Sequence, residues 1–201
     1  RRMTYAEAME KYGSDKPDTR FGMEFFELNN LAKNKGFKIF DDAELVVGIN
    51  IEECAKYSRK QLDKITHFVR RPQVGANGLV YVKYNEDGTF KSSVDKFFDH
   101  EDLKKWANQL NAKPGDLLLI LADEVAKVRS QMNELRLYMG DELGLRNPNV
   151  FKPLWVVDFP LLEWDNDTER FHAMHHPFTS PKEEDFDKME SNPKEVRANA
   201  F

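Results

Sequence analysis

Apolar residues recur at helical spacing in several stretches of the chain, and most of these stretches start or stop at a recognisable signal. Residues 4–7 form a capping box, because the hydroxyl of Thr4 can accept from the amide of Glu7 while the glutamate reaches back. The helix that starts there is predicted to end at about Tyr12, before Gly13. The same spacing predicts further helices over residues 23–35, 58–71, 99–110 and 123–143. Residues 182–188 are predicted to start an acidic helix, with Ser180 as its candidate cap, and Asn192 and Pro193 are predicted to end it.

Other stretches concentrate β-branched and aromatic residues between turn formers, as strands do. Short strands are predicted over residues 37–40, 45–51, 79–84, 89–94 and 117–122. A hairpin is predicted where two aromatic-rich runs, residues 159–164 and 170–181, flank the turn-forming residues 165–169, with residues 154–158 leading into it. Pro160 and Pro177 stand where its ladder of hydrogen bonds would start and stop.

The composition fits a mixed α+β protein of one or two domains, with 201 residues, of which 40% are hydrophobic and 15 are Phe. No run of roughly 18 apolar residues predicts a membrane span, and no charged start leads into an apolar stretch. The single cysteine, Cys54, rules out an internal disulfide and fits a reducing cytoplasm. The net charge of −5 argues against a broad electrostatic platform for nucleic acid.

The second run of the predicted hairpin contains three histidines. Side chains alternate along a strand, so in an extended segment His175 would share a face with Phe171, while His172 and His176 would share the opposite face. Adjacent histidines that point apart cannot easily bind one metal ion, so no metal site is predicted. Two interpretations stay open: a histidine satisfied in the core, or a donor that binds an anionic or amide ligand.

A short polar segment follows the first predicted helix. Pro17 disfavours helical backbone at the residue before it, and Ser14 and Asp15 favour turns, so residues 14–18 are predicted to form a shaped loop. The pattern fits an ordinary turn or a loop that contacts a ligand.

The predicted helix over residues 123–143 has an apolar stripe that indicates core packing, formed by Val125, Val128, Met132, Leu135 and Met139. Arg129, Arg136 and Arg146 are expected to lie outside this stripe, where they would meet phosphates or face water.

Two long motifs resemble those of bacterial-type aspartyl-tRNA synthetases. One is Met-His-His-Pro-Phe-Thr-Ser-Pro at residues 174–181, preceded by Phe-Pro-Leu-Leu-Glu-Trp at residues 159–164. The other is Met-Thr-Tyr-Ala-Glu-Ala-Met at residues 3–9, followed by Tyr-Gly-Ser-Asp-Lys-Pro-Asp at residues 12–18. The residues between these motifs resemble the GAD domain, an insertion found in this family.

The resemblance implies three parts. Residues 1–22 would be a flank of the catalytic domain, residues 23–146 a small α+β GAD insertion, and residues 147–201 the return into an antiparallel-sheet class II catalytic domain. The two ends of the chain are expected to fold side by side, with residues 12–18 and His175 in one amino-acid pocket and the middle as a separate body. The chain opens at Arg1 and stops where the next catalytic strand would begin, so we expect a piece of a longer polypeptide.

The resemblance also implies a reaction. The family activates L-aspartate with ATP and Mg²⁺ and transfers it to the terminal adenosine of tRNA(Asp), in a cytoplasmic enzyme expected to be a homodimer. His175 matches the histidine that binds aspartate, and His176 is the second residue expected at the aspartate site, as its neighbour or orienter. Ser14, Asp15 and Lys16 would lie near tRNA or substrate. The family's catalytic motifs and most ATP and Mg²⁺ contacts fall outside these residues, so the chain alone is expected to be inactive and to bind neither.

Two other classes of function remain open at this point. The middle of the chain could be a tRNA-binding or structural module, as GAD domains are in tRNA-dependent amidotransferases. A histidine-cluster metalloenzyme is the other alternative. The sequence does not distinguish an enzyme specific for aspartate tRNA from one that also charges asparagine tRNA.

Overall fold

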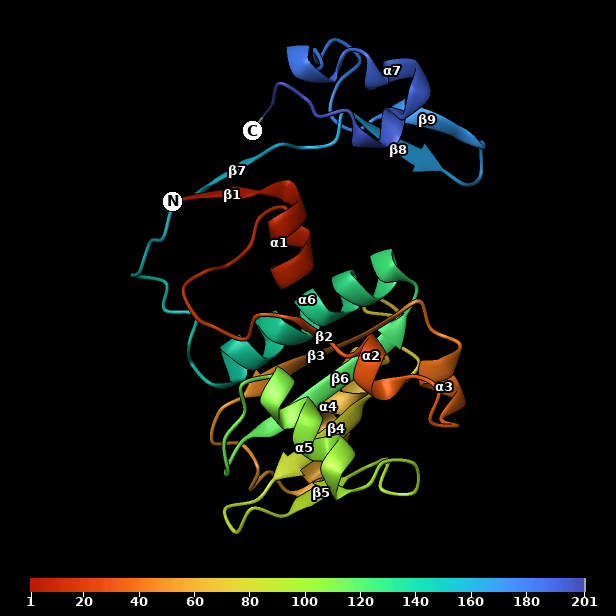
Figure 1. Cartoon of the computed structure of the whole chain (residues 1–201). Helices are drawn as coiled ribbons and strands as arrows, with labels where there is room; N and C mark the ends of the chain where they lie inside the picture. The colour runs from red at the N-terminus through yellow and green to blue at the C-terminus, as the bar shows by residue number, and fades with distance from the viewer. Residues whose placement is uncertain (201) are drawn as a thin grey trace. The chain divides into compact units, whose positions relative to one another are not determined.

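The computed structural model describes residues 1–200, and Figure 1 traces the chain from its N-terminus to its C-terminus. Contacts divide the chain into two compact units. The smaller unit consists of residues 1–10 and 152–201, and the larger unit consists of residues 11–151.

The larger unit is built on a five-stranded antiparallel sheet with the strand order β2-β3-β6-β4-β5. Its strands are β2 (Phe26–Glu27), β3 (Leu45–Ile51), β4 (Val80–Tyr84), β5 (Phe90–Ser92) and β6 (Leu117–Asp123). The central pair, β3 and β6, is in register over seven residues, with Gly48 opposite Ile120. Both of these strands are rich in Leu, Ile and Val because both of their faces are covered.

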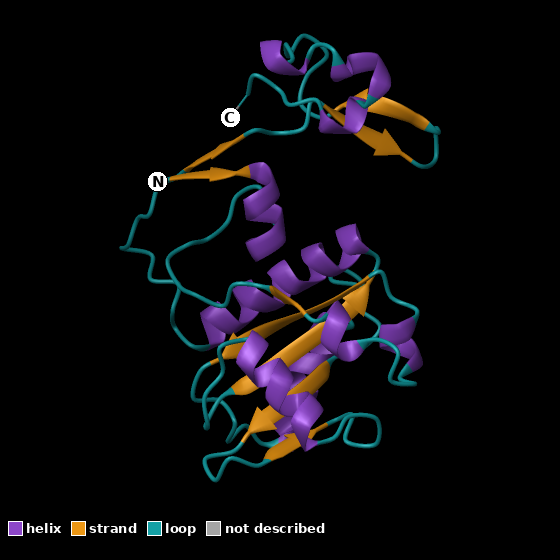
Figure 2. Ribbon diagram, viewed as in Figure 1, coloured by secondary structure: helices purple, strands orange, loops and turns teal. Residues whose placement is uncertain are grey.

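Helices lie on both faces of this sheet (Figure 2). They are α2 (Asn29–Ala32), α3 (Lys38–Asp41), α4 (Arg59–Val69), α5 (His100–Gln109) and α6 (Val125–Glu142). Strand alternation divides the core into two clusters: Leu117 and Leu119 pack with apolar residues of α4 and α6, whereas Leu118 and Ile120 pack with those of α2, α3 and α5. The mixed α/β architecture with an antiparallel sheet agrees with the predicted class.

The strongest helix signals are confirmed. Ser58 accepts a hydrogen bond from the amide of Gln61, whose side chain accepts from the amide of Ser58, so both halves of the predicted capping box form at the start of α4. Asp99 likewise caps α5 by accepting from the amide of Asp102 at 2.9 Å. Four of the five stripe residues predicted for α6 are buried, and only Val125 is exposed.

Two predictions for the start of the insertion are wrong. Residues 23–35 do not form one helix, because Met23 has a φ of 61° and Phe26 and Glu27 pair with β3 before the short α2 begins. Residues 37–40 were predicted as a strand, yet residues 38–41 form α3, in which Phe40 is buried. In both places tertiary pairing and packing outweigh the local pattern.

The smaller unit contains two short sheets. In the first, β1 (Arg2–Thr4) pairs in parallel with β7 (Trp155–Val157), so residues 154–158 do not begin the hairpin as predicted. The second is the predicted hairpin, formed by β8 (Leu162–Asp165) and β9 (Arg170–Ala173). Helix α1 (Tyr5–Tyr12) follows β1, with the amide of Glu7 donating to Thr4 as predicted, and Gly13 follows it with a φ of 66°.

After the hairpin, the acidic helix predicted to start at residues 182–188 is replaced by three short elements. These are the 3-10 turn η1 (Glu183–Asp185), α7 (Lys188–Ser191) and the 3-10 turn η2 (Pro193–Glu195). The residue that precedes the first turn is Lys182 rather than the predicted cap Ser180, and it makes no capping hydrogen bond. Asn192 and Pro193 end α7, as the sequence indicated.

Candidate functional site

The first candidate site is the polar loop of the larger unit. Residues 13–16 bend sharply after α1, Ser14 accepts a hydrogen bond from the amide of Lys16 at 3.1 Å, and Pro17 is buried beneath them. Lys16 is exposed and makes no ion pair within residues 1–200. The predicted candidates Ser14, Asp15 and Lys16 therefore form one short, partly exposed tip.

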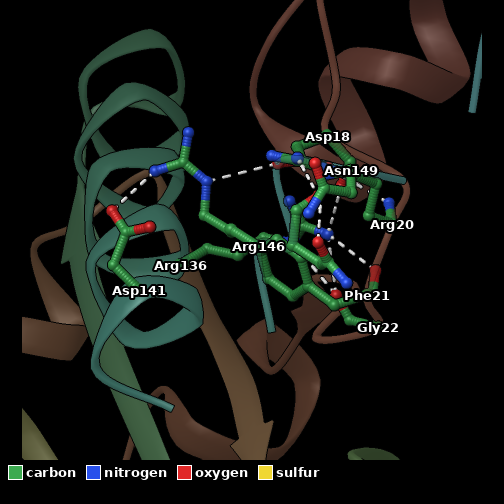
Figure 3. A network of polar contacts seen from close by, with 9 residues as sticks. Asp18, Arg20, Phe21, Gly22, Arg136, Asp141, Arg146 and Asn149 are labelled. Atoms are coloured by element: carbon green, nitrogen blue, oxygen red, sulfur yellow. Dashed lines mark hydrogen bonds and ion pairs between the residues drawn. The ribbon is translucent and has the colours of Figure 1, made fainter. Parts of the chain in front are cut away.

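The loop is fastened to α6 by one buried guanidinium. Arg136 is 0% exposed. Its Nη2 donates to the carbonyl oxygens of Asp18, Phe21 and Gly22 at 2.8, 3.0 and 2.7 Å, and its Nε donates to those of Gly22 and Met23 at 3.1 and 3.2 Å (Figure 3). A single side chain thus binds four carbonyl groups of residues 18–23.

Two aromatic rings also lie beside the guanidinium of Arg136, and together with the four carbonyl groups they form a cage around it. The guanidinium carbon of Arg136 lies 4.1 Å from the ring centre of Phe21 and 4.8 Å from that of Tyr12, which are distances of cation–π contacts. Burial lowers the pKa of Arg136 to about 10, against the opposing effect of Tyr12, Asp18 and Glu24. Its Nη1 is buried without a hydrogen-bond partner within residues 1–200.

Two further arginines, Arg20 and Arg146, bind the carboxylate of Asp18. Arg20 donates to it through Nε at 2.9 Å and Nη2 at 2.7 Å, and Arg146 approaches it at 3.3 Å while also pairing with Asp141 at 2.6 Å (Figure 3). Hydrogen bonds from Arg20 lower the pKa of Asp18 to about 2. Asp18 is therefore ionised at neutral pH and belongs to the internal support of the loop.

The expectation that Arg136 and Arg146 meet phosphates or face water is wrong for both. Arg136 follows Met132 by four residues and Val128 by eight, so it lies on the buried side of α6 at the edge of the apolar stripe. This spacing was the signal that sequence reasoning missed. Arg146 is half-buried and ion-paired instead.

The second candidate site is the segment that follows β9 in the smaller unit. The strand ends at Ala173, so the alternation expected for residues 170–176 does not extend to His175 and His176, and both of these side chains are exposed. The ring of His175 stands at 87° to that of Phe159, with 4.8 Å between their centres. Phe159 is buried and also contacts Tyr5, at 5.1 Å.

The other histidines have local partners. His176 accepts a hydrogen bond at Nδ1 from the amide of Phe178 at 3.2 Å, which makes it part of the turn. His172 lies in β9, with its Nε2 at 2.8 Å from the hydroxyl of Thr168 and 3.7 Å from Asp165. Within residues 1–200, no three His, Cys, Asp or Glu side chains are grouped as metal ligands.

Backbone pairing supports both ends of the histidine segment. Before it, the amide of Met174 donates to Leu161 at 3.0 Å; after it, Ser180 accepts from the amide of Asn199 at 2.9 Å. The amide of Lys182 donates to the carbonyl of Arg197, also at 2.9 Å. The turn that carries the two exposed imidazoles is therefore held at both ends by backbone hydrogen bonds.

A buried carboxylate reinforces the second of these ends. The side chain of Asp185 is 1% exposed, and it accepts from Nε of Arg197 at 2.6 Å and from Lys188 at 3.0 Å. These hydrogen bonds, led by that of Arg197, hold the pKa of Asp185 far below its usual range. A further pair joins Lys182 to Asp158.

The prediction that residues 12–18 lie beside His175 joins residues of two different units, and it stays a prediction. Within residues 1–200 no helix has the length and apolar character needed to cross a bilayer.

Comparisons with known proteins agree with the resemblance predicted from the motifs. Residues 39–132 match the GAD domain family. The chain is 58% identical over 200 residues to an aspartate–tRNA ligase of Flavobacterium psychrophilum, and 56% and 55% identical over 201 residues to those of Parabacteroides distasonis and Porphyromonas gingivalis. These alignments cover 100% of this chain and 34% of each relative, so the chain spans about a third of the length of these curated relatives.

Proposed function

We propose that these 201 residues form the part of an aspartate–tRNA ligase that includes a GAD insertion and the catalytic segments on both sides of it. The main support is the identity of 55–58% to such ligases across the whole chain, which includes both flanking motifs as well as the insertion. Such a ligase joins L-aspartate to the 3′ adenosine of tRNA at the expense of ATP, in the cytoplasm, as a homodimer.

In this proposal the smaller unit belongs to an antiparallel class II catalytic sheet. Two-stranded parallel pairs such as β1 and β7 are rarely stable without neighbouring strands, and Trp155 of β7 is 55% exposed. Further strands of the ligase would extend this pair and cover the exposed ring.

His175 is the proposed contact for the carboxylate of aspartate. Its ring is exposed, packs edge-to-face against Phe159 and lies on a turn whose ends are held by backbone pairing, so it can meet a ligand without rearrangement. An imidazole can donate to a carboxylate, and a donor already in place loses little entropy on binding. His176 would support the turn through its bond to Phe178 rather than bind the substrate directly.

Catalysis in such a ligase is positioning and charge stabilisation, and no residue described here is assigned as a nucleophile or general base. We propose that most contacts to ATP and Mg²⁺ lie in the parts of such a ligase outside these residues. We propose that Ser14, Asp15 and Lys16 contact the acceptor end of tRNA, since an exposed ammonium and a hydroxyl are typical phosphate contacts.

The test uses the complete ligase that contains this chain. It should charge tRNA(Asp) with aspartate, and His175→Ala should raise the KM for aspartate by about 10-fold or more while leaving the KM for ATP within about 2-fold. His67→Ala, which removes an exposed imidazole of α4 in the other unit, is the matched control for the loss of an imidazole. The isolated 201-residue chain should give no aspartate-dependent pyrophosphate exchange. An unchanged KM for aspartate would remove His175 from the site.

A further inference from the structure

The cage around Arg136 encloses a buried charge that has no carboxylate partner among the described residues. A buried guanidinium usually binds a carboxylate, yet Arg136 forms no ion pair within residues 1–200, and its charge is stabilised by four carbonyl groups and two rings. The carbonyls belong to the loop, whereas the guanidinium belongs to α6. The conformation of residues 12–23 is thus determined by a helix more than 100 positions away in sequence, at separations of 113 to 118 residues.

Close approaches of the backbone make the fit specific. A Cβ on Gly13, which has a φ of 66°, would lie 2.1 Å from the carbonyl oxygen of Arg129 on α6. A Cβ on Gly140, also on α6, would lie 2.7 Å from the ring of Phe21. The loop is pressed against α6 at two glycines, one on each side of the cage, and its ends are joined where the amide of Phe25 donates to the carbonyl of Lys11 at 2.9 Å.

We infer that Arg136 is a positioning residue for the tRNA-dependent step of the ligase, because it holds Ser14, Asp15 and Lys16 in the one arrangement that meets the acceptor end of tRNA. This inference rests on the proposed function. Arg136 touches no substrate; it acts through the backbone of residues 18–23 and through the tip that precedes them.

The choice of tRNA over the small substrates follows from what the tip exposes. The carboxylate of Asp18 is already bound by Arg20 and Arg146, and the donors of Arg20 are used on Asp18 and on the carbonyl of Asn147. The tip also carries the exposed ammonium of Lys16 and the partly exposed side chains of Ser14 and Asp15. The ammonium and the hydroxyl suit a phosphodiester backbone, and the carboxylate of Asp15 suits a donor such as a base amine. Loss of the Arg136 side chain should therefore lower the rate of transfer to tRNA more than the rate of aspartate activation.

The experiment measures both partial reactions of the complete ligase. Arg136→Met should lower single-turnover transfer of aspartate to tRNA by about 10- to 100-fold, since a displacement of about 1 Å in a positioning group costs that much. Aspartate-dependent pyrophosphate exchange should fall less than about 3-fold. Arg136→Lys should recover part of the transfer rate, because an ammonium can donate to the carbonyls but cannot fill the planar slot between two rings.

Two further variants keep the test decisive if Arg136→Met does not fold. Gly140→Ala leaves the guanidinium intact but displaces Phe21, so it should lower transfer selectively, by about 3- to 10-fold. Arg59→Lys changes an exposed arginine of α4 in the same unit and should leave both reactions within about 2-fold.

Equal loss of transfer and exchange in Arg136→Lys and Gly140→Ala would overturn the inference, because a merely structural residue lowers both reactions with the amount of folded enzyme. Transfer within about 2-fold of the unsubstituted enzyme in both variants would also overturn it. If the unsubstituted ligase forms no aspartyl-tRNA at all, the proposed function itself fails, and that result is distinct from either of the others.

Discussion

The two candidate loops of this protein are held in place by opposite means. The tip at residues 14–16 depends on a side chain from a distant helix, because Arg136 binds the carbonyl groups of the residues that follow it. The turn that presents His175 depends on its own backbone, which pairs at both ends with neighbouring segments, and on Asp185 and Arg197 beyond it. We therefore expect a single substitution to release the first loop, whereas its backbone pairs would still hold the second.

The largest effect should come from Arg136→Met. Four partly buried carbonyl groups would lose their charged donor together, and each hydrogen bond to a charged group contributes about 1.5–3 kcal/mol, so the free energy of unfolding of the larger unit should fall by about 3 kcal/mol or more. Chemical denaturation checks this, with Arg59→Met, on an exposed arginine of α4, as the matched control. A loss as small as that of the control would mean that the cage contributes little to folding.

A smaller effect is expected from Asp185→Asn in the other unit. The amide keeps the shape but loses the charge that binds Arg197 and Lys188, while the backbone pairs around residues 180–199 remain. Hydrogen exchange should quicken in residues 180–199 and stay unchanged in residues 12–23. Glu184→Gln, which alters a 63% exposed partner of Arg197, is the control and should have little effect. Faster exchange in both regions would contradict the independence of the two supports.

The smallest effect is a dependence on pH. Asp18 has a pKa lowered to about 2, so its ionised form stabilises the fold at pH values above the unfolded pKa of about 4, and this stabilisation is lost as the pH falls from about 4 through about 2. Asp18→Asn should flatten the pH dependence of the unfolding midpoint over that interval. If the unfolding midpoint depends on pH in the same way in both proteins, the ion pair with Arg20 does not contribute to the pH dependence of stability.

Much of the fold could be predicted from the sequence, since local signals agree with tertiary context there. The capping box at Ser58, the cap at Asp99 and the apolar runs of β3 and β6 each indicate one structure, and each is found. The errors lie where the chain has few local signals, as at residues 23–40, where β2 exists only because β3 pairs with it. The candidate site residues could be predicted from motifs in the sequence, whereas the buried side chain of Arg136 that supports the first loop could not.

By itself, the sequence indicated the candidate residues: Ser14, Asp15 and Lys16 before a proline, and His175 and His176 in the second run of a predicted hairpin. Turn formers and strand ends are local properties, so they can be read from neighbours along the chain. Only the tertiary structure decided that Arg136 is buried and binds the backbone of residues 18–23. A buried charge needs partners with the right geometry, and those partners lie more than a hundred residues away, at separations of 113 to 118 residues.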